Sequence, residues 1–410
     1  MSAAGNPLDF DVDALALLSA EQAVDKLLVF AVETNCSDVF FFSESATFTL
    51  SVRRHGFMRT LGAIPLDLGR HMVGNIKASA SMDIAESRRP RDGRWLHRAG
   101  TRHLDVRINT IPTVHGVDMT LRIWDRQAGL KSLTDIGLSR SDEQSLTSLL
   151  SRPSGLMLIT GPTGTGKTTT MYACIKYLAD GTRKINTLED PVEIIVPGVR
   201  QSQVAEKIDV GFPTLLKNIL RQAPDVIMVG EIRDAETATT AVRAANSGHL
   251  VLASLHAPVA AGAVHTMLAF GSNPYFFASG LLAVVAQRLL RTLCRNCRVQ
   301  YDISEAPQTF KELEGLLAPG EGSVIYGPGS CEQCHGTGYD GRTGLFEIMS
   351  MTRDIRDQIA KGATRAEIED VARAAGMIEF RRAALLKVAQ GITSTEDLLR
   401  DIPAEFLGAD

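Results

Sequence analysis

Residues 161–168 contain the feature that most constrains the fold of this chain of 410 residues. They read Gly-Pro-Thr-Gly-Thr-Gly-Lys-Thr and match the pattern G-x-x-x-x-G-K-[ST]. The glycines permit a backbone in which successive N–H groups converge on a phosphate, and a following helix adds the positive end of its dipole. An apolar run precedes the loop and a helical pattern follows it. The sequence therefore predicts a phosphate-binding loop between a buried strand and a helix.

We expect this loop to bind the phosphates of ATP. Lys167 can reach the β and γ oxygens, and the Thr168 hydroxyl can complete the shell of a Mg²⁺ ion. The predicted nucleotide-binding residues are Gly161, Pro162, Thr163, Gly164, Thr165, Gly166, Lys167, Thr168 and Thr169. An ordinary glycine-rich turn is the alternative interpretation of the same string.

The pattern around the loop indicates an α/β domain over residues 133–410. Short apolar runs read as buried strands, and helical patterns follow them. The predicted strands are 156–160, 225–229 and 250–255, and the predicted helices are 167–178, 214–222 and 235–245. Strands that alternate with helices are typical of a parallel sheet.

The N-terminal part of the chain has a different pattern. A capping box at Ser19–Gln22 begins a predicted helix. Predicted strands follow at 38–42, 47–52, 105–110 and 119–124. This predicts a small α+β domain over 1–125, with 1–18 as a flexible start and 126–132 as a linker. Capping boxes at Thr364–Glu367 and Thr393–Glu396 predict a helical cap over 350–403.

Two acidic sites follow the loop at the ends of predicted strands. Glu231 comes after the strand 225–229 and can orient or deprotonate an attacking water. Gly230 stands where the Mg²⁺-binding Asp of such enzymes is usual, so this second motif is atypical. Glu189, next to Asp190, ends another short strand and can assist by holding Mg²⁺ through water. A solvated strand end is the alternative for both acids.

Four of the six cysteines form two identical pairs. Cys294-x-x-Cys297 and Cys331-x-x-Cys334 are separated by 33 residues. Four thiolates at this spacing suit a closed, tetrahedral zinc site, so residues 290–345 are predicted to form a zinc-binding insertion. His335 is not expected to be a ligand, because four sulfurs fill the shell. The remaining cysteines, Cys36 and Cys174, are predicted to be small core residues.

Charge and hydropathy disfavour several classes of protein. The formal net charge of −4 gives no support to direct binding of nucleic acid, which usually needs a basic excess. No apolar run approaches the ~18–20 residues of a membrane helix. The first twenty residues lack the basic start and apolar run of a secretory signal. We therefore expect a cytoplasmic protein with reduced thiols that meets a membrane only through a partner.

Taken together, these motifs resemble those of the hexameric ATPases of type II secretion and type IV pilus assembly. The resemblance runs from about residue 23 to residue 403. Its most specific part is the segment LRQAPDVIMVGEIRD over 220–234, which follows an acidic box at 187–193. The segment 248–256 resembles the histidine box of the family, and 338–347 extends the similarity toward the C-terminus.

The resemblance implies a RecA-like ATPase domain, a PAS-like N-terminal domain and a ring of six chains. It also implies that the N-terminal domain brings Arg107 and Arg122 onto the γ-phosphate, where a guanidinium neutralises charge on the phosphate oxygens. His256 would sense this phosphate or organise the acids beside it. The alternatives are exposed strand arginines and a hydrogen-bonded core histidine.

The chain departs from the family pattern at several places. Ala257-Pro258-Val259 stands where the family usually has Thr-Asn-Asp, which leaves the network around His256 open. His55-Gly56 replaces Asp-Gly at a predicted turn, and His tolerates the positive φ fairly well. Val117 replaces a glutamate. The chain also begins almost directly with the PAS-like domain, without the extra N-terminal domain of many longer relatives.

The implied function is that of a motor. We expect a homo-hexamer that hydrolyses ATP with Mg²⁺ to power pilus assembly or type II secretion through an inner-membrane platform protein, with zinc as a structural metal. The predicted catalytic residues are Lys167, Glu189, Glu231, His256, Arg107 and Arg122. The alternatives are a pilus-retraction motor, a type IV secretion ATPase and, from another class, a zinc-ribbon nucleic-acid adaptor. Retraction relatives generally lack the four cysteines.

Overall fold

The computed structural model describes residues 10–125 and 130–406. Close contacts divide the chain into two compact units. The first comprises Met1–Gly129, Cys294–Cys297 and Gly329–Gly341, and the second Leu130–Leu293, Arg298–Pro328 and Arg342–Asp410. The two cysteine pairs thus group with the N-terminal segment. The domain limits predicted from the sequence, 1–125 and 133–410, stay a prediction.

The predicted flexible start and linker lie partly outside the described residues, over 1–9 and 126–129. Within the described part, Asp13–Leu17 form a short 3-10 helix (η1) whose Leu15 is fully buried. The ring of Phe10 also packs against Phe30, with 4.7 Å between the ring centroids. Phe10 and Leu15 therefore pack on the core of this unit, whereas Leu17 is 88% exposed. The flexible start over 1–18 stays a prediction for the other residues.

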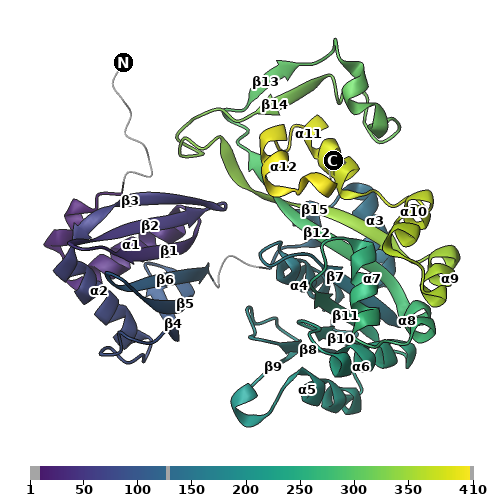
Figure 1. The fold of residues 1–410 in the computed structure, drawn as a ribbon, viewed down its shortest axis with the longest axis horizontal. Helices are drawn as coiled ribbons and strands as arrows, with labels where there is room; N and C mark the ends of the chain where they lie inside the picture. Colours follow the sequence, from purple (N-terminus) through teal and green to yellow (C-terminus); the bar gives the residue numbers. More distant parts are fainter. Residues whose placement is uncertain (1–9, 126–129, 407–410) are drawn as a thin grey trace. The chain divides into compact units, whose positions relative to one another are not determined.

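An antiparallel sheet with the strand order β3-β2-β1-β6-β5-β4 forms the base of the first unit (Figure 1). Its strands are β1 (Cys36–Ser43), β2 (Thr47–Arg54), β3 (Phe57–Pro65), β4 (Arg91–Ala99), β5 (Arg102–Thr113) and β6 (Gly116–Asp125). Helices α1 (Ala20–Glu33) and α2 (Leu66–Ser79) pack on the face that carries buried residues such as Leu50, Val106 and Leu121. The capping box at Ser19 is confirmed, because its hydroxyl and the Gln22 side chain bond each other's backbone N–H.

A seven-stranded sheet with the order β15-β12-β7-β11-β10-β8-β9 runs through the second unit. Its strands are β7 (Gly155–Thr160), β8 (Ile185–Glu189), β9 (Arg200–Gln203), β10 (Val226–Val229), β11 (Leu250–Leu255), β12 (Leu281–Leu293) and β15 (Tyr339–Ser350). From β12 to β9 all neighbouring strands run parallel. The predicted α/β class and the three predicted strands are confirmed. A separate antiparallel pair is formed by β13 (Val299–Asp302) and β14 (Val324–Gly327).

Helices cover both faces of this sheet. One core joins a face of the sheet to α3 (Arg140–Leu150) and α4 (Lys167–Leu178). The core of the other face includes residues of α5 (Phe212–Ile219), α6 (Ala235–Asn246), α7 (Ala260–Ala269) and α8 (Pro274–Gly280). The helix predicted over 214–222 begins two residues earlier, and its last three residues form a 3-10 turn, η4 (Leu220–Gln222). No helix of the described residues has the length and apolar character needed to cross a membrane.

The predicted helical cap consists of α9 (Arg353–Lys361), α10 (Arg365–Ala374), α11 (Phe380–Ala389) and α12 (Thr395–Asp401). The capping box at Thr364 is confirmed. The box predicted at Thr393 is wrong by one residue, because Ser394 is the N-cap and accepts from the N–H of Asp397 at 3.2 Å. Thr393 is buried, and its hydroxyl donates to the carboxylate of Asp397, which also accepts from the buried Arg291. The remaining short 3-10 segments are η2 (Leu133–Asp135), η3 (Glu206–Ile208), η5 (Pro307–Leu313) and η6 (Ala404–Phe406).

One buried carboxylate accepts hydrogen bonds from the first residues of two helices in the second unit. Glu347 on β15 is only 4% exposed and accepts from the N–H of Ala260, the first residue of α7, at 2.8 Å. It also accepts from the N–H of Phe380, the first residue of α11. Neither helix has a side-chain cap of its own, so Glu347 supplies the acceptor that Val259 cannot. Burial nevertheless raises the pKa of Glu347 from 4.5 to about 7.

We predict that Glu347→Ala lowers the free energy of unfolding by about 2 kcal/mol, because two helix starts lose their acceptor. A carboxyl whose pKa is raised in the folded state contributes stability that is present below its unfolded pKa and is lost as the pH rises through the folded pKa. The difference between wild type and Glu347→Ala should therefore be larger at pH 5 than at pH 8. Chemical unfolding at both pH values checks this, with the exposed Glu305→Ala as a control that shows neither effect. An equal difference at the two pH values would contradict the assignment.

Candidate active site and metal centre

The loop over 161–166 connects the end of β7 to the start of α4. Gly161, Gly164 and Gly166 have φ angles of 147°, 82° and 87°, in the region that favours glycine. A Cβ at Gly161 would lie 2.5 Å from the carbonyl oxygen of Gln287 on β12, so this close approach requires glycine. The buried amide of Gln287 donates to the carbonyl of Thr165 at 2.6 Å. The shape of the loop thus depends on β12 as well as on its own sequence.

Lys167 is the first residue of α4, and its ammonium group points back at the loop. It donates to the carbonyls of Gly161 and Pro162, at 2.7 and 3.0 Å. Burial lowers the pKa of Lys167, and the nearby charge of Glu231 opposes this shift. Thr168, the next residue, lies exposed on the first turn of the helix. These are the positions that a lysine and a hydroxyl need in order to meet phosphate oxygens and a Mg²⁺ ion at the helix start.

His256, just after β11, joins Lys167 to Glu231. The ammonium nitrogen of Lys167 lies 3.3 Å from Nδ1 of His256, and Nε2 of the same ring lies 2.8 Å from Oε1 of Glu231. An ammonium group has no acceptor, so Nδ1 accepts and Nε2 carries the proton that is donated to Glu231. The second oxygen of Glu231 accepts from Arg233, whose Nη2 lies 2.7 Å away. This contact raises the pKa of Arg233.

Gly230 explains why the second motif lacks the usual aspartate. Its N–H donates to the carbonyl of Leu188 on β8 at 2.7 Å, and its own carbonyl accepts from Ser254 at 2.5 Å. A Cβ at this position would lie 2.9 Å from the same Leu188 oxygen, so any side chain would force the strands apart. The carboxylate is therefore carried by the next residue, Glu231.

Glu189 at the end of β8 lies in a different environment. It is 4% exposed, and Oε1 accepts from Thr187 at 2.5 Å and from Gln201 at 3.0 Å. Oε2 accepts from the hydroxyl of Tyr172 on α4. Burial, together with Glu189, raises the pKa of Tyr172. The same hydroxyl accepts from the N–H groups of Glu193 and Ile194, each at 3.2 Å, so Tyr172 fastens the acidic box to the helix of the phosphate loop.

The structure thus brings Lys167, His256 and Glu231 into one contact chain. Glu189 belongs to a neighbouring network, and the adjacent Asp190 faces Arg233 at 3.4 Å. Sequence reasoning missed four residues that hold these groups, namely Tyr172, Gln201, Arg233 and Gln287. Arg233 lies within the segment 220–234 that carries the family resemblance, although its contact with Glu231 was not predicted. The only signal for Tyr172 is a phenol hydroxyl on an apolar helix.

Arg107 and Arg122 lie opposite each other on β5 and β6 in the first unit. The strand register continues their row to Asp38 on β1 and Arg53 on β2 on one side, and to Arg94 on β4 on the other. Neighbouring residues along these strands belong to the core, so the arginine row lies on the sheet face opposite α1 and α2.

Asp38 is the buried counter-charge of this row. Its Oδ1 accepts from Nε of Arg122 at 3.1 Å, and Nε of Arg53 lies 3.5 Å from its Oδ2. The side chain of Arg122 is nevertheless 69% exposed. Asp38 therefore orients an arginine that remains open to an anion.

The four predicted cysteines form a cluster in which all sulfur atoms lie within 4.8 Å of one another. The Sγ atoms of Cys294 and Cys331, of Cys297 and Cys334, and of Cys331 and Cys334 are each 3.7 Å apart. This is far longer than a disulfide and close to the ~3.8 Å edge of a tetrahedron with metal–sulfur bonds of ~2.3 Å. The donor set therefore fits a tetrahedral metal ion. Cys36 and Cys174 are buried, as predicted.

We predict that Tyr172→Phe lowers the free energy of unfolding by roughly 1–3 kcal/mol, because two N–H groups and a buried carboxylate lose their partner. Tyr177→Phe is the matched control, since this half-exposed tyrosine lies on the same helix. Denaturant unfolding measures both variants. Equal stability of the two variants would show that the acidic box is held without the Tyr172 hydroxyl.

Comparisons with known proteins give the family of this chain. The family model described as type II/IV secretion system protein matches residues 15–400. The type II secretion system protein E of Pseudomonas aeruginosa is 38% identical over 377 residues, which cover 92% of this chain and 74% of that protein. The type IV pilus assembly ATPase PilB of Thermus thermophilus is 35% identical over 394 residues, which cover 96% of this chain and 44% of that protein. The structure of the Legionella pneumophila ATPase DotB shares the fold, with a TM-score of 0.66 at 20% identity over 91% of this chain and 93% of that one. The chain is therefore an ATPase that belongs to the family of type II/IV secretion system proteins.

Proposed function

We propose that this ATPase powers type IV pilus assembly or type II secretion as a homo-hexamer in the cytoplasm, acting through an inner-membrane platform protein. The observation that carries the proposal is the contact chain from Lys167 through His256 to Glu231, which links the phosphate loop to an acid at a strand end. The similarity to secretion and pilus proteins over most of the chain supports the choice of process.

In this proposal the backbone N–H groups of residues 161–169 hold the ATP phosphates. Lys167 turns from its own loop carbonyls to the β and γ oxygens, and Thr168 contributes to the Mg²⁺ shell, where the ion neutralises phosphate charge. Glu231 orients the attacking water and accepts its proton. A carboxylate offers about four lone-pair sites, so Glu231 can bond a water while His256 and Arg233 stay in contact. Glu189, which is buried at the end of β8, assists by holding Mg²⁺ through water.

Arg107 and Arg122 complete the proposed site by contacting the γ-phosphate. Two adjacent guanidinium groups on one row match the charge that spreads over phosphate oxygens in phosphoryl transfer. A change in the position of this domain during the ATP cycle would then supply the mechanical stroke.

We also propose that Cys294, Cys297, Cys331 and Cys334 hold a zinc ion. Four sulfurs fill its shell, so the metal is structural and takes no part in hydrolysis. The cluster also favours the assembly or secretion motor over a retraction motor, because retraction relatives generally lack these cysteines.

We predict that Glu231→Gln preserves ATP affinity within about twofold and lowers the turnover number by at least ~10²-fold, because the amide cannot accept the proton of water. Lys167→Ala should instead lose nucleotide affinity. Titration with a fluorescent ATP analogue and phosphate release measure the two properties. The control is Glu236→Gln, an exposed glutamate that pairs with Lys217. Normal turnover in Glu231→Gln would remove this residue from its role.

We predict that Arg107→Gln and Arg122→Gln each lower the turnover number by ~10³–10⁵-fold while nucleotide still binds. Arg102→Gln is the matched control, since Arg102 lies at the start of β5 and pairs with Asp125. Steady-state hydrolysis at saturating ATP gives the answer. Wild-type turnover in both variants would make them ordinary strand arginines.

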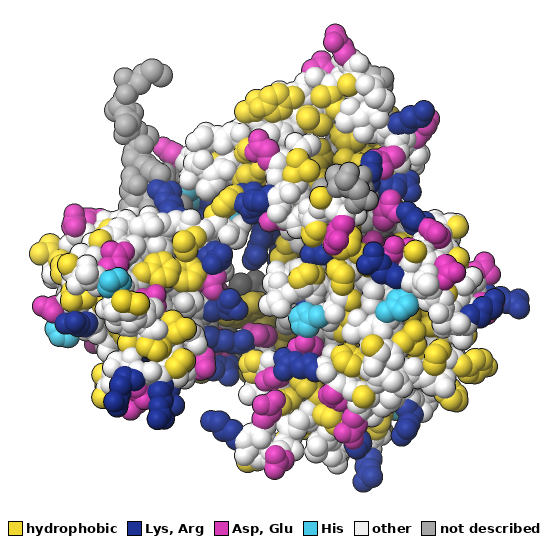
Figure 2. Space-filling view, in the orientation of Figure 1, with side chains coloured by type: hydrophobic (Ala, Val, Ile, Leu, Met, Phe, Trp, Pro, Cys, Tyr) yellow, Lys and Arg dark blue, Asp and Glu magenta, His cyan; other side chains and the backbone are white. Residues whose placement is uncertain are grey.

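The alternative from another class, a nucleic-acid adaptor, predicts strong binding of single-stranded DNA and no hydrolysis. On the face shown in Figure 2, basic side chains of the larger unit are interspersed with acidic ones, which does not favour it. ATP turnover measured with and without single-stranded DNA at moderate salt separates the two classes. A type IV secretion ATPase is the remaining alternative, and scoring surface pili and secreted proteins after deletion in the native cell distinguishes the processes.

A further inference from the structure

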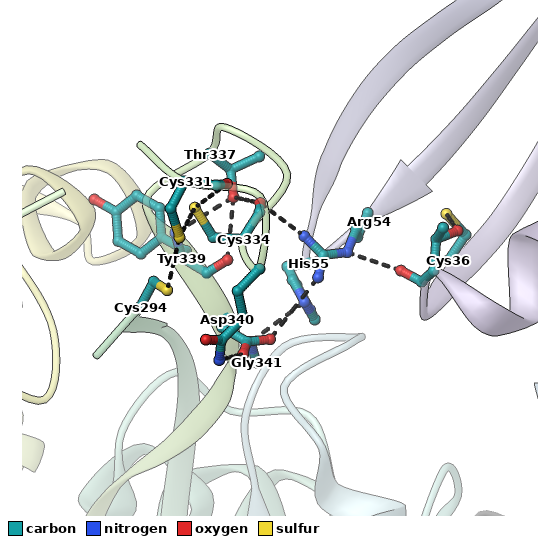
Figure 3. A network of polar contacts seen from close by, with 12 residues as sticks. Cys36, Arg54, His55, Cys294, Cys331, Cys334, Thr337, Tyr339, Asp340 and Gly341 are labelled. Atoms are coloured by element: carbon teal, nitrogen blue, oxygen red, sulfur yellow. Dashed lines mark hydrogen bonds and ion pairs between the residues drawn. The ribbon is translucent and has the colours of Figure 1, made fainter. Parts of the chain in front are cut away.

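The hairpin between β2 and β3 contacts the second cysteine pair of the same unit, as Figure 3 shows. Arg54 is the last residue of β2, and His55 and Gly56 form the turn with φ angles of 47° and 87°. These are left-handed values at both central positions, as in the tight turns that join antiparallel strands. The predicted turn therefore survives with His55, and it points its side chains at the segment 331–341.

Arg54 is a buried cation, with only 6% of its surface exposed. Its Nε donates to the carbonyl of Thr34 at 2.8 Å, and its Nη1 donates to the carbonyl of Cys334 at 3.1 Å. Its Nη2 lies 3.8 Å from a carboxylate oxygen of Asp340, which is partly exposed. Two of the three partners thus belong to the cysteine segment.

His55 makes a second contact with the same segment. Its Nε2 accepts from the N–H of Gly341 at 3.2 Å, so the proton of the neutral ring is on Nδ1. Histidine stands here in place of the aspartate of the family pattern, and its longer side chain reaches this backbone group. Arg54 and His55 therefore hold the segment 334–341 at both of its ends.

Cys334 is a ligand position as well as a partner of the hairpin. Its sulfur accepts from the N–H of Gly338 at 3.2 Å, and its carbonyl accepts from Thr337 at 2.7 Å and from Arg54. Four thiolates around a divalent ion leave a net charge of about −2. The buried guanidinium of Arg54 lies beside this carbonyl and carries the opposite charge. A buried charge needs such a partner at low dielectric, so Arg54 and the metal site can stabilise each other.

We propose that Arg54 and His55 form the outer shell of the metal site, so that metal binding and the seating of the β2–β3 hairpin stabilise each other. The inference rests on the proposed use of the four cysteines as zinc ligands. Outer-shell partners orient metal ligands, and their loss typically costs 10–100-fold in metal affinity. Because coupling of two equilibria is reciprocal, removal of the metal must loosen the hairpin by the same free energy.

The first arm of the test measures zinc affinity in the full chain. One zinc per chain is expected in wild type, titrated against a competing chromophoric chelator. Arg54→Gln should bind zinc 10–100-fold more weakly. His55→Asn keeps a residue that accepts positive φ and removes the contact with Gly341, so it should weaken binding in the same direction. Arg98→Gln is the matched control, since Arg98 bonds Gly100 at another hairpin tip of the same sheet and should match wild type.

The second arm needs no substitution. Amide hydrogen exchange of the wild-type chain is compared with zinc bound and after its removal by chelation. Exchange over 52–58 should accelerate on zinc removal, whereas the β5–β6 hairpin around 113–116 should not change. This arm keeps the test decisive even if Arg54→Gln folds poorly.

The outcomes separate two different failures. A chain that binds no zinc would overturn the metal site itself. A chain that binds zinc through all four cysteines, but with equal affinity in Arg54→Gln, His55→Asn and wild type and with unchanged exchange over 52–58, would overturn the coupling alone. Weaker binding in Arg98→Gln equal to that in Arg54→Gln would likewise overturn it.

Discussion

Parallel strand pairing is the constraint on which the candidate active site depends. Glu189 ends β8, whereas Lys167, Glu231 and His256 follow β7, β10 and β11. Because these four strands are parallel, their carboxyl ends lie at the same side of the sheet. The N–H of Gly230 fixes the end of β10 against β8, and Thr160 at the end of β7 accepts from the N–H of Ala257 at 2.8 Å. These contacts hold the loops in register, so segments almost a hundred residues apart meet within hydrogen-bond distance.

Most local patterns in the sequence were sufficient, although the capping box predicted at Thr393 is wrong by one residue. The phosphate loop and the four cysteines were predicted from the spacing of their residues, and the three central strands from their apolar runs. The sequence failed where a partner comes from elsewhere in the chain. Tyr172 on α4 matters through Glu189 on β8. Near Thr393 the helix begins one residue late, because Ser394 is the N-cap, while Thr393 and Arg291 bond the carboxylate of Asp397. Such tertiary contacts leave no mark on the local pattern.

The departures from the family pattern are met by long-range partners. The side chain of Val259 cannot cap α7, and the carboxylate of Glu347 on β15 instead accepts a hydrogen bond from the N–H of Ala260. His55 replaces a turn aspartate and bonds Gly341 in the cysteine segment. Gly230 carries no carboxylate, but its small size allows the close approach to Leu188 that puts Glu231 beside His256. Each substitution is therefore a local change in the sequence whose effect is offset by a contact with a residue far away in the chain.

The arginine row also acts over a distance. Arg94, Arg107 and Arg122 lie side by side on one sheet face, and Arg53 follows beyond Asp38. The formal charge of the chain is −4, and Asp38 and Asp105 are partial counter-charges of this row. Such a strip creates a local positive potential that draws polyanions before any contact forms. At physiological ionic strength this attraction reaches about 8 Å, and added salt shortens it. We therefore expect ionic strength to set the rate at which this face captures an anion, whatever the affinity of the final contacts.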